Sequence, residues 1–595
     1  MAWWEPAIFI LYDAQLPELL APMQEVNSMF VNYDAKRGGP FDSAQLNEIP
    51  NGPGQYWKSP VSQQSPLSRR SKRKDHRRLV MILSILLLFL LILSAVRFMS
   101  VESGNNDQLV LNVGNQQQAL IDLRQPGIPI SPYLFGVNVF PKIGTTSLDS
   151  QNGNYTGFMS YDAPVVNGLQ SAGIKLLRFP GGSWGEDQQG QNHILSYQQL
   201  YDFSTLLYQV GADGMVQARL SNPINAAGDP ASLPDRANLA GNWVDFMSNP
   251  NSLIRKRSGF ANVQIHPIKF WSVGNEPDKL KDPDQPGKPL TVAAYVNDFI
   301  QYSIVMHQNN PNIKVFGPEI SQFYGIGSGP KDTMGTLWME GFLEGIAKYE
   351  KAHPDLPFHL LDGVSFHRYQ FIDASTSPSL LMSSPTEWDY MLPTLRQFIR
   401  QIMGRDVPVA ITEINTNPNA QVPTRGEAAL WWADTLGTLM NQQAEFVAFF
   451  SAEGVQQPYP LFNENGSQTA MYRVMEMFSH VQSNLIPLQI QHDPVSVYAT
   501  ADDAHQAVGL LFVNKSSTNQ LAEVRSENQF FGFSPWHTQD ISIGAGSIVL
   551  ITLHRNGGAE AVSFIVPGID DAAINPLRQT VCGNKTDPLG YDIPC

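Results

Sequence analysis

Cysteine is almost absent from this sequence: Cys582 and Cys595 are the only two among 595 residues, and both lie in the last segment of the chain. A scaffold held together by many disulfides is therefore excluded, and so few ligands do not suggest a zinc site. If the segment lies outside the cell, we expect a disulfide between the two cysteines, which would stabilise the tail by ~3 kcal/mol. Two free thiols are the alternative.

Charged residues are also scarce, at 16% of the chain, and the formal net charge is −15. Residues 1–99 hold 11 Lys and Arg against 8 Asp and Glu, whereas the rest of the chain holds 28 against 46. An acidic main body argues against nucleic acid as a partner, because phosphates require a basic surface. Neutral or cationic ligands remain open. A chain of this length is expected to form at least two folded units.

One long apolar run stands apart from the globular pattern. Residues 79–96, LVMILSILLLFLLILSAV, contain no charge, and at ~1.5 Å per residue they reach ~27 Å, close to the thickness of a bilayer. The basic run RRSKRKDHRR at 69–78 should stay in the cytoplasm. We predict a single-pass protein of the cell membrane, with a transmembrane helix at 79–99 in the lipid bilayer. A largely disordered cytoplasmic tail, 1–78, would precede it, and the rest would be extracellular. The alternatives are a cleaved signal peptide and a buried core helix.

Between residues 131 and 484, short apolar runs alternate with helical stretches. In residues 291–308, for example, apolar side chains recur at the spacing of a helix with one apolar face. This alternation implies a parallel sheet, and eight units favour a closed (β/α)8 TIM barrel, with an open doubly wound sheet as the alternative. The predicted strands are residues 133–140, 174–180, 214–220, 268–274, 312–317, 361–367, 407–413 and 445–451.

The pattern changes after residue 484 to alternation with period two and to β-branched residues, which predicts an antiparallel β-sandwich over residues 485–570. Residues 100–130 are predicted to be a linker with the first sandwich strands, since the stretch at 109–123 has the same character and could complete the same sandwich. Residues 571–595 are left as a C-terminal tail with the possible disulfide.

Polar residues stand at the ends of the predicted barrel strands. Because the C-terminal ends of barrel strands meet at one mouth, such side chains are candidates for chemistry rather than packing. Two carboxylates, on the fourth and seventh strands, should thus face one cavity. In chain order, the candidates are Asn138, Arg178, Asn275, Glu276, His367, Tyr369 and Glu413.

Two carboxyl groups in one mouth are what glycoside hydrolysis needs: one gives a proton to the departing oxygen and the other attacks the anomeric carbon. Arg178 and the Tyr369 hydroxyl are suitable donors to keep Glu413 charged, so Glu413 is predicted to be the nucleophile. Glu276, with apolar neighbours, is predicted to be the acid/base with a raised pKa. Asn275 would bind the sugar 2-hydroxyl, and the two carboxylates should lie ~5 Å apart.

The motifs WSVGNEPD, ITEIN, SFHRY and LRFPGG together resemble the clan A retaining glycoside hydrolases. Their order most resembles the α-L-arabinofuranosidase group, family 51, over residues 109–555. The resemblance implies a barrel with a C-terminal β-sandwich, and it implies Glu276 as acid/base and Glu413 as nucleophile. The supporting residues that it implies are Asn275, Arg178, His367 and Tyr369.

The sequence also departs from the arabinofuranosidase pattern. The first strand ends with Asn138, where that group tends to offer a sugar-binding Glu, and the eighth ends in FFSAEG without the Trp that many clan members stack under the sugar. Asn138 is nevertheless a substrate-binding candidate, together with Trp184, whose ring could stack on a sugar face. The step GNEP also recurs in xylosidase-like and glucuronidase-like relatives. The clan is therefore indicated more firmly than the substrate.

Each candidate also has a structural interpretation. Glu276 could cap the next helix, Arg178 could be a structural ion-pair partner, and His367 could be a satisfied polar residue of the core. Tyr369 could be a wall residue, and Trp271 is assigned to barrel packing. Two further acidic residues that end strands are held in reserve as catalytic candidates, namely Glu319 and Glu453.

The sequence as a whole predicts a membrane-anchored retaining glycoside hydrolase that acts on extracellular polysaccharide or oligosaccharide by double displacement. Its best-matched activity is that of an α-L-arabinofuranosidase. The alternatives are another clan A specificity (β-xylosidase, β-glucuronidase or endo-glucanase) and a non-catalytic glycan-binding protein on the same barrel. No cofactor or metal is expected, because this chemistry needs none. The oligomeric state is not predicted.

Overall fold

The computed structural model describes residues 108–113, 117–144, 157–186, 194–221, 231–370, 377–417, 423–455, 458–488, 492–525, 541–554, 559–566 and 576–581. The predicted transmembrane helix, the basic run before it, the cytoplasmic tail and both cysteines lie outside these residues, so the anchor and the disulfide stay predictions. Within the described part of the chain, no helix is both long enough and apolar enough to cross a membrane.

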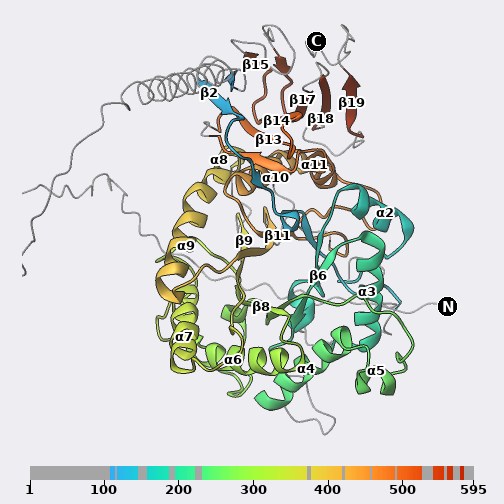
Figure 1. Ribbon diagram of the computed structural model, residues 1–595, viewed down its shortest axis with the longest axis vertical. Coiled ribbons are helices and arrows are strands. Elements are labelled where there is room, and N and C mark those ends of the chain that lie inside the picture. Colours follow the sequence, from blue (N-terminus) through green and yellow to red (C-terminus); the bar gives the residue numbers. More distant parts are fainter. Residues whose placement is uncertain are drawn as a thin grey trace, which may run out of the picture. The chain divides into compact units, whose positions relative to one another are not determined.

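Eight parallel strands close into a barrel, as predicted (Figure 1). The last strand pairs with the first, which closes the ring, so the alternative of an open doubly wound sheet is wrong. Each strand overlaps the range predicted for it. The strands are β4 (Gly136–Asn138), β5 (Leu176–Phe179), β6 (Asp213–Ala218), β7 (Phe270–Val273), β8 (Lys314–Ile320), β9 (Gly363–Tyr369), β10 (Val409–Asn415) and β11 (Phe446–Phe449).

Helices surround the strands, as α3, α4, α6, α7 and α9 do in Figure 1. In α6, Thr291 caps the first turn by accepting a hydrogen bond from the N–H of Ala294, and the predicted apolar stripe packs inward with Tyr295 and Phe299 fully buried. The α-helices are α2 (Ala163–Ser171), α3 (Tyr197–Val210), α4 (Leu233–Ser248), α5 (Leu253–Arg257), α6 (Val292–Asn309), α7 (Trp338–Ala352), α8 (Pro378–Ser383), α9 (Trp388–Met403), α10 (Arg425–Asn441) and α11 (Ala470–Phe478). The 3-10 helices are η1 (Pro132–Leu134), η2 (Gly182–Glu186), η3 (Pro277–Lys279) and η4 (Ser384–Glu387).

Aromatic rings close the N-terminal end of the barrel. Phe270 and Phe446 are the first residues of β7 and β11, and their rings meet with centroids 5.1 Å apart. The ring of Tyr133 stacks on Phe446 with centroids 5.0 Å apart, and Phe316 adds an edge contact to the same cluster. Because this end is filled with apolar side chains, the polar mouth of the barrel lies at the opposite end, as the fold requires.

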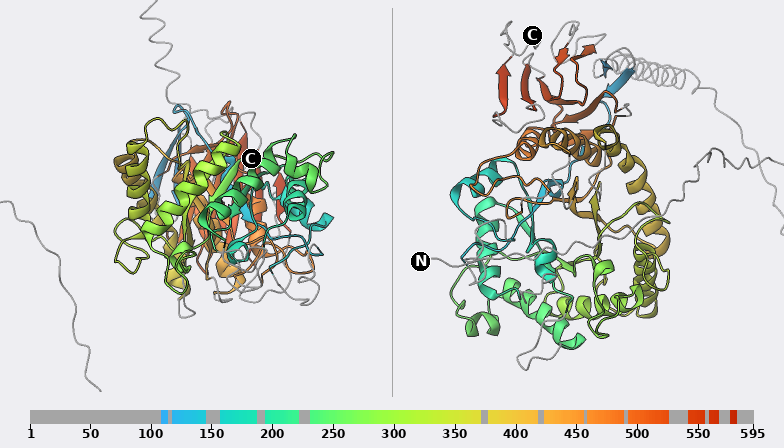
Figure 2. Two further views of the ribbon diagram at one scale, coloured as in Figure 1. Left: turned by 90° about the horizontal axis from the view of Figure 1, so that it is seen from below. Right: turned by 180° about the vertical axis from the view of Figure 1, so that it is seen from behind.

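Two antiparallel sheets form the predicted sandwich, with strand orders β16-β15-β1-β2 and β19-β18-β17-β14-β13-β12-β3. Figure 2 shows the blue strands from the start of the described chain beside the red strands from its end, which confirms that the early stretch completes the sandwich. β19 continues the larger sheet past residue 570, where the sequence placed the end of the sandwich. The strands are β1 (Gln108–Val113), β2 (Gln117–Asp122), β3 (Ile128–Pro129), β12 (Asn484–Ile486), β13 (Val495–Ala501), β14 (Ala507–Asn514), β15 (Gln520–Arg525), β16 (Ile541–Ile543), β17 (Ser547–His554), β18 (Ala559–Ile565) and β19 (Arg578–Val581).

A buried polar cluster joins the sandwich to the barrel helix α10. Asp434 on α10 is fully buried, and its carboxylate accepts from Lys515 Nζ at 2.6 Å and from the Tyr498 hydroxyl at 2.6 Å. His492 lies 3.7 Å from the same carboxylate. Three sandwich side chains therefore share one barrel anion, which fixes the two parts to each other.

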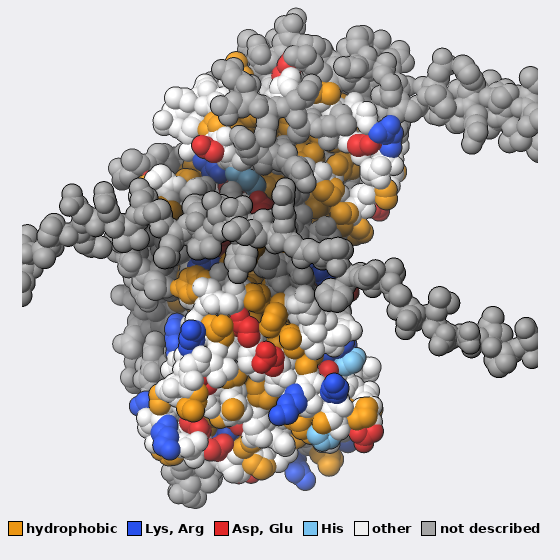
Figure 3. Space-filling model, turned by 90° about the vertical axis from the view of Figure 1, so that its left-hand side faces the viewer, with side chains coloured by type: hydrophobic (Ala, Val, Ile, Leu, Met, Phe, Trp, Pro, Cys, Tyr) orange, Lys and Arg blue, Asp and Glu red, His pale blue; other side chains and the backbone are white. Residues whose placement is uncertain are grey.

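On the face of the molecule drawn in Figure 3, acidic and basic side chains are interspersed. The described side chains of this face thus do not form the continuous basic surface that a nucleic acid would need.

Candidate active site

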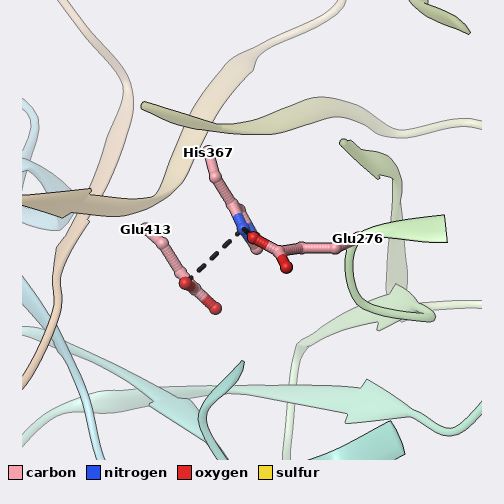
Figure 4. Close-up of side chains that lie close together, drawn as sticks. All are labelled: Glu276, His367 and Glu413. Carbon is pink, nitrogen blue, oxygen red and sulfur yellow. Dashed lines mark hydrogen bonds and ion pairs between the residues drawn. The ribbon is translucent and has the colours of Figure 1, made fainter. Parts of the chain in front are cut away.

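Three ionisable side chains meet in the barrel from strands far apart in the sequence (Figure 4). Glu276 follows β7, His367 lies on β9 and Glu413 lies on β10. One carboxylate oxygen of each Glu and one ring nitrogen of His367 all lie within 4.8 Å of one another. The three residues are 7%, 0% and 3% exposed, respectively. The nearest oxygens of the two carboxylates are therefore no more than 4.8 Å apart, which is within the ~5 Å expected of a retaining pair.

Glu413 is held by the two donors that the sequence suggested. Arg178 Nη1 donates to Glu413 Oε1 at 2.9 Å, and the Tyr369 hydroxyl donates to Oε2 at 2.7 Å. Burial and the charge of Glu413 hold the pKa of Tyr369 well above its ordinary value, so its hydroxyl stays a donor. Arg178 is fully buried, so its cation acts on Glu413 with little screening by water.

A glycine lets the loop after β5 pass close to the nucleophile. Gly182 has φ +55, and a Cβ placed on it would lie 3.4 Å from Glu413 Oε1 and 3.1 Å from the ring of Phe450. The motif RFPGGSW therefore contributes backbone as well as Arg178, because a residue without a side chain is needed where the loop turns beneath Glu413.

Glu276 stands in an unusual backbone conformation, with φ 48 and ψ 53. It precedes the 3-10 helix η3, but its side chain makes no capping hydrogen bond, so the capping interpretation does not account for it. Instead, Oε1 lies 3.3 Å from His367 Nδ1, and Oε2 accepts from Lys279 Nζ at 2.9 Å. The side chain of Lys279 is 54% exposed, so this contact lies at the edge of the cluster.

The raised pKa predicted for Glu276 is wrong for the site without substrate. Burial would raise the pKa, but the hydrogen bond and charge of His367, together with Lys279, lower it to about 2. Burial would lower the pKa of His367, but the charge of Glu413 and the hydrogen bonds that His367 donates to Glu276 and Glu319 raise it to about 9. At neutral pH the proton therefore lies on His367, next to Glu276. The sequence could not show that Lys279 folds back onto Glu276.

Glu319, held only in reserve from the sequence, lies in this cluster. It is fully buried at the end of β8. Its Oε2 accepts from Arg178 Nη2 at 2.8 Å and from Thr412 Oγ1 at 3.0 Å, and lies 3.2 Å from His367 Nε2. Despite burial, the charges of Arg178 and His367 lower its pKa to about 2. A third anion thus belongs to the site. Its only signal in the sequence was its place at a strand end.

The remaining predicted side chains differ in what they can reach. Asn275 Oδ1 accepts from Arg178 Nη2 at 2.8 Å, whereas its Nδ2 is buried and has no hydrogen-bond partner among the described residues. Asn138 is fully buried. Its Oδ1 accepts from Arg178, and its Nδ2 donates to the carbonyl of Thr412 at 2.8 Å. Asn138 therefore positions Arg178 instead of contacting sugar as predicted.

Two aromatic candidates and one acid lie outside the cluster. The ring of Trp184 is 8% exposed and packs with its edge toward Phe158, with centroids 5.9 Å apart. Trp271 is fully buried in the core, as its packing assignment expects. Glu453, the second reserve residue, accepts from the N–H of Ser160 at 2.6 Å and so ties two loops together.

The three clustered side chains also have a spacing that could admit a metal ion. Each of them already has hydrogen-bond partners within the protein, and these partners account for the arrangement. We therefore assign no metal ion to the cluster.

Comparison with known proteins adds evidence at the level of the fold. No protein-family model matches the sequence, and no curated protein matches it. An arabinofuranosidase structure aligns with a TM-score of 0.53 and 13% identity over 78% of this chain and 94% of that one. The α-L-arabinofuranosidase of Thermotoga maritima, solved as an arabinose complex, aligns with a TM-score of 0.51 and 12% identity over 77% of this chain and 98% of that one. A family 51 arabinofuranosidase from Xanthomonas axonopodis pv. citri aligns with a TM-score of 0.50 and 14% identity over 75% of this chain and 99% of that one.

This chain has the fold of the arabinofuranosidases. The alignments span nearly the whole length of those proteins, so they take in more than the barrel. At identities this low the likeness establishes the fold alone, and it confirms the fold that the sequence motifs implied.

Proposed function

We propose that this protein is a retaining glycoside hydrolase in which Glu413 is the nucleophile and Glu276 is the acid/base. One observation carries the proposal: an oxygen of Glu276 and an oxygen of Glu413 lie within 4.8 Å of each other. Retaining enzymes keep their carboxyl groups ~5–5.5 Å apart, whereas inverting enzymes need ~6.5–9.5 Å to admit a water molecule between them. The observed separation favours a covalent glycosyl-enzyme.

In the first step, an oxygen of Glu413 attacks the anomeric carbon while the bond to the leaving oxygen breaks, and Glu276 gives that oxygen a proton. Arg178 and Tyr369 fix the orientation of the attacking carboxylate, because each binds one of its two oxygens. Asn275 Nδ2 is buried and has no partner among the described residues; in this proposal it turns toward the bound sugar and donates to the acceptor oxygen of the 2-hydroxyl, a contact that strengthens as positive charge develops.

Glu276 must be protonated for this step, although its proton lies on His367 in the free site. The two atoms that exchange it, His367 Nδ1 and Glu276 Oε1, are 3.3 Å apart. A leaving oxygen that approaches Glu276 removes water and favours the neutral acid, so the proton passes to Glu276 and leaves a neutral imidazole. In the second step, Glu276 takes a proton from the water that releases the sugar from Glu413.

An α-L-arabinofuranoside is the first substrate to test. The arabinofuranosidase motifs in the sequence and the likeness to three solved arabinofuranosidases support this choice. The other clan A specificities stay as alternatives, because Asn138 stands where arabinofuranosidases tend to offer a Glu and is occupied with Arg178. A non-catalytic glycan-binding role is the alternative from a different class.

A panel of aryl glycosides tests the proposal. Wild-type protein should release the phenol from at least one arabinofuranoside, xyloside or glucuronide, and NMR of the first-formed sugar should show the anomeric configuration of the substrate. Glu413→Ala should abolish this release. If wild type cleaves none of these substrates and Glu413→Ala binds glycan as wild type does, the protein is a binding protein. An inverted product would contradict the double displacement.

We also propose that the enzyme is anchored in the cell membrane with its catalytic part outside. The apolar run at 79–96 and the basic run at 69–78 support this topology. The full chain should stay in the membrane pellet after extraction with alkaline carbonate, and protease added to intact cells should digest the catalytic part. Release of the chain into the carbonate supernatant would contradict the anchor, and protection from the protease would contradict the topology.

A further inference from the structure

Glu319 contacts both Arg178 and His367, the side chains that lie against the two catalytic carboxylates, and is itself buried away from a substrate. Its side chain has an exposed fraction of 0%. The same oxygen, Oε2, lies 2.8 Å from Arg178 Nη2 and 3.2 Å from His367 Nε2. Arg178 binds Glu413 with its other terminal nitrogen, and His367 faces Glu276 with its other ring nitrogen. Glu319 is thus linked to each catalytic carboxylate through one intervening side chain, Arg178 or His367.

The backbone of Glu319 makes a further connection to the acid/base. Its carbonyl oxygen accepts from the N–H of Glu276 at 2.9 Å. Both residues have a left-handed backbone, with φ 60 at Glu319 and φ 48 at Glu276. Side chains other than glycine adopt this conformation at a cost of ~1–3 kcal/mol each, and such a cost persists where the surroundings hold the residue for a purpose. The strand ends β7 and β8 are thereby locked together at the acid/base.

We infer that Glu319 is a positioning residue for both catalytic carboxylates, and this inference rests on the proposed function. It holds the imidazole of His367 through Nε2, so that Nδ1 carries its proton toward Glu276. It also holds the guanidinium of Arg178 through Nη2, so that Nη1 stays on Glu413.

The charges around His367 explain why an anion is needed here. Among the described residues, the charged groups that face the imidazole are the carboxylates of Glu276, Glu319 and Glu413 and the guanidinium of Arg178. Without the anion at Glu319, a protonated imidazole would keep the repulsion from Arg178 and lose one of its counter-charges. His367 is fully buried, so the lost counter-charge is only weakly replaced by solvent. The shared proton would then leave at a lower pH.

Glu319→Gln isolates this role, because glutamine keeps the length of the side chain and one acceptor oxygen but removes the charge. The measurement is the pH dependence of kcat/KM of the full chain in detergent, with phenyl and 2,4-dinitrophenyl glycosides of the sugar that wild type cleaves. With the phenyl glycoside, the alkaline limb should move down by about one pH unit, so activity on the alkaline side falls roughly tenfold more than at the optimum. With the dinitrophenyl glycoside, whose leaving group needs no proton, the limb should not move comparably.

Glu453→Gln is the matched control, since Glu453 is also a buried carboxyl, follows the barrel strand β11, and accepts from the N–H of Ser160 outside the cluster. Its alkaline limb should coincide with that of wild type. An unshifted limb in Glu319→Gln, with activity lowered equally at every pH, would overturn the inference and leave Glu319 a purely structural residue. Wild-type protein without activity on any aryl glycoside would instead defeat the proposed function, so the two failures are distinguishable.

Glu319→Asp keeps the test decisive if the Gln variant does not fold. Aspartate preserves a counter-charge for Arg178 but shortens the reach to His367 by one carbon. The variant should therefore lose more kcat on the phenyl glycoside than on the dinitrophenyl glycoside. Equal losses on the two substrates would mean that Glu319 does not act through the proton of His367, which overturns the inference.

Discussion

His367 Nδ1 lies 3.3 Å from Glu276 Oε1, and the two side chains hold one proton between them in the free site. The hydrogen bond and charges of the cluster place this proton on the histidine, which has a pKa of about 9, and leave the carboxyl ionised, with a pKa of about 2. The acid of the proposed reaction is thus a pair rather than a single carboxyl group, and its titration belongs to the pair.

The first prediction concerns the alkaline limb of wild-type activity. Because the pKa of His367 is raised, the shared proton is retained below the raised value and lost as the pH rises through about 9. Hydrolysis of a phenyl glycoside should therefore persist across neutral pH and fall above about pH 9. A pH profile of kcat/KM measures this limb. A limb near pH 6 would show that the pair does not hold the proton in this way.

The second prediction separates the two carboxylates by their roles. Glu276→Ala should slow cleavage of a phenyl glycoside by ~10²–10⁴-fold and cleavage of a dinitrophenyl glycoside far less, because a good leaving group hardly needs the proton. Azide should restore the activity of the Glu276→Ala variant, since the small anion attacks the glycosyl-enzyme in place of activated water. The glycosyl azide that forms should keep the anomeric configuration of the substrate. Product NMR measures the configuration. Equal loss on both substrates would remove Glu276 from the acid/base role.

The arrangement of the barrel could be predicted from the sequence because it depends on local signals. Apolar runs such as residues 268–274, ended by a polar residue and then by Pro277, mark strand ends on their own. Since strand ends converge in a closed barrel, placing Glu276 and Glu413 at two of them was enough to bring them into one mouth.

The electrostatics of the site could not be predicted in the same way, because they depend on pairs that meet only in the folded chain. The apolar neighbours of Glu276 suggested a raised pKa, but the contacts of His367 and Lys279 lower it to about 2. No motif in the sequence marks Glu319 as part of the site, although its Oε2 meets donors from three other strands. Burial can therefore be predicted from the sequence more readily than the charged groups that come into contact in the folded protein.

The third prediction concerns Lys279 at the edge of the cluster. Lys279→Met removes the cation 2.9 Å from Glu276 Oε2, one of the groups that lower the pKa of this carboxyl. The pair should then hold its proton more tightly, so the alkaline limb should move to higher pH, opposite to the shift expected for Glu319→Gln. The pH profile of phenyl glycoside cleavage measures the shift.

Lys314→Met is the control for Lys279→Met, because Lys314 is 55% exposed, against 54% for Lys279, and also pairs with one carboxylate. Lys314 begins β8, at the opposite end of the strand from Glu319. Its replacement should leave the limb where it is in wild type. A limb that moves equally in both variants would mean that the shift reflects net charge rather than the contact with Glu276.

The fourth prediction concerns the junction of barrel and sandwich, where Asp434 is fully buried against Lys515 and Tyr498. Asp434→Asn leaves the ammonium of Lys515, itself 5% exposed, without its counter-charge. Removing one partner of a buried ion pair costs ~3–5 kcal/mol, so the melting temperature should fall by several degrees. Calorimetry of the variant and wild type measures this loss. Equal melting temperatures would show that water or another group replaces the carboxylate.

The same junction should make the folded protein less stable at alkaline pH. Burial would lower the pKa of His492, but hydrogen bonds and charges from Asp389 and Asp434 raise it to about 9. A raised pKa contributes stability that is fully present below the ordinary value of about 6.5 and is lost as the pH rises through about 9. The melting temperature of wild type should therefore decline across this interval, and His492→Gln should decline less because it carries no such proton. Parallel declines in the two proteins would place the alkaline loss of stability elsewhere in the fold.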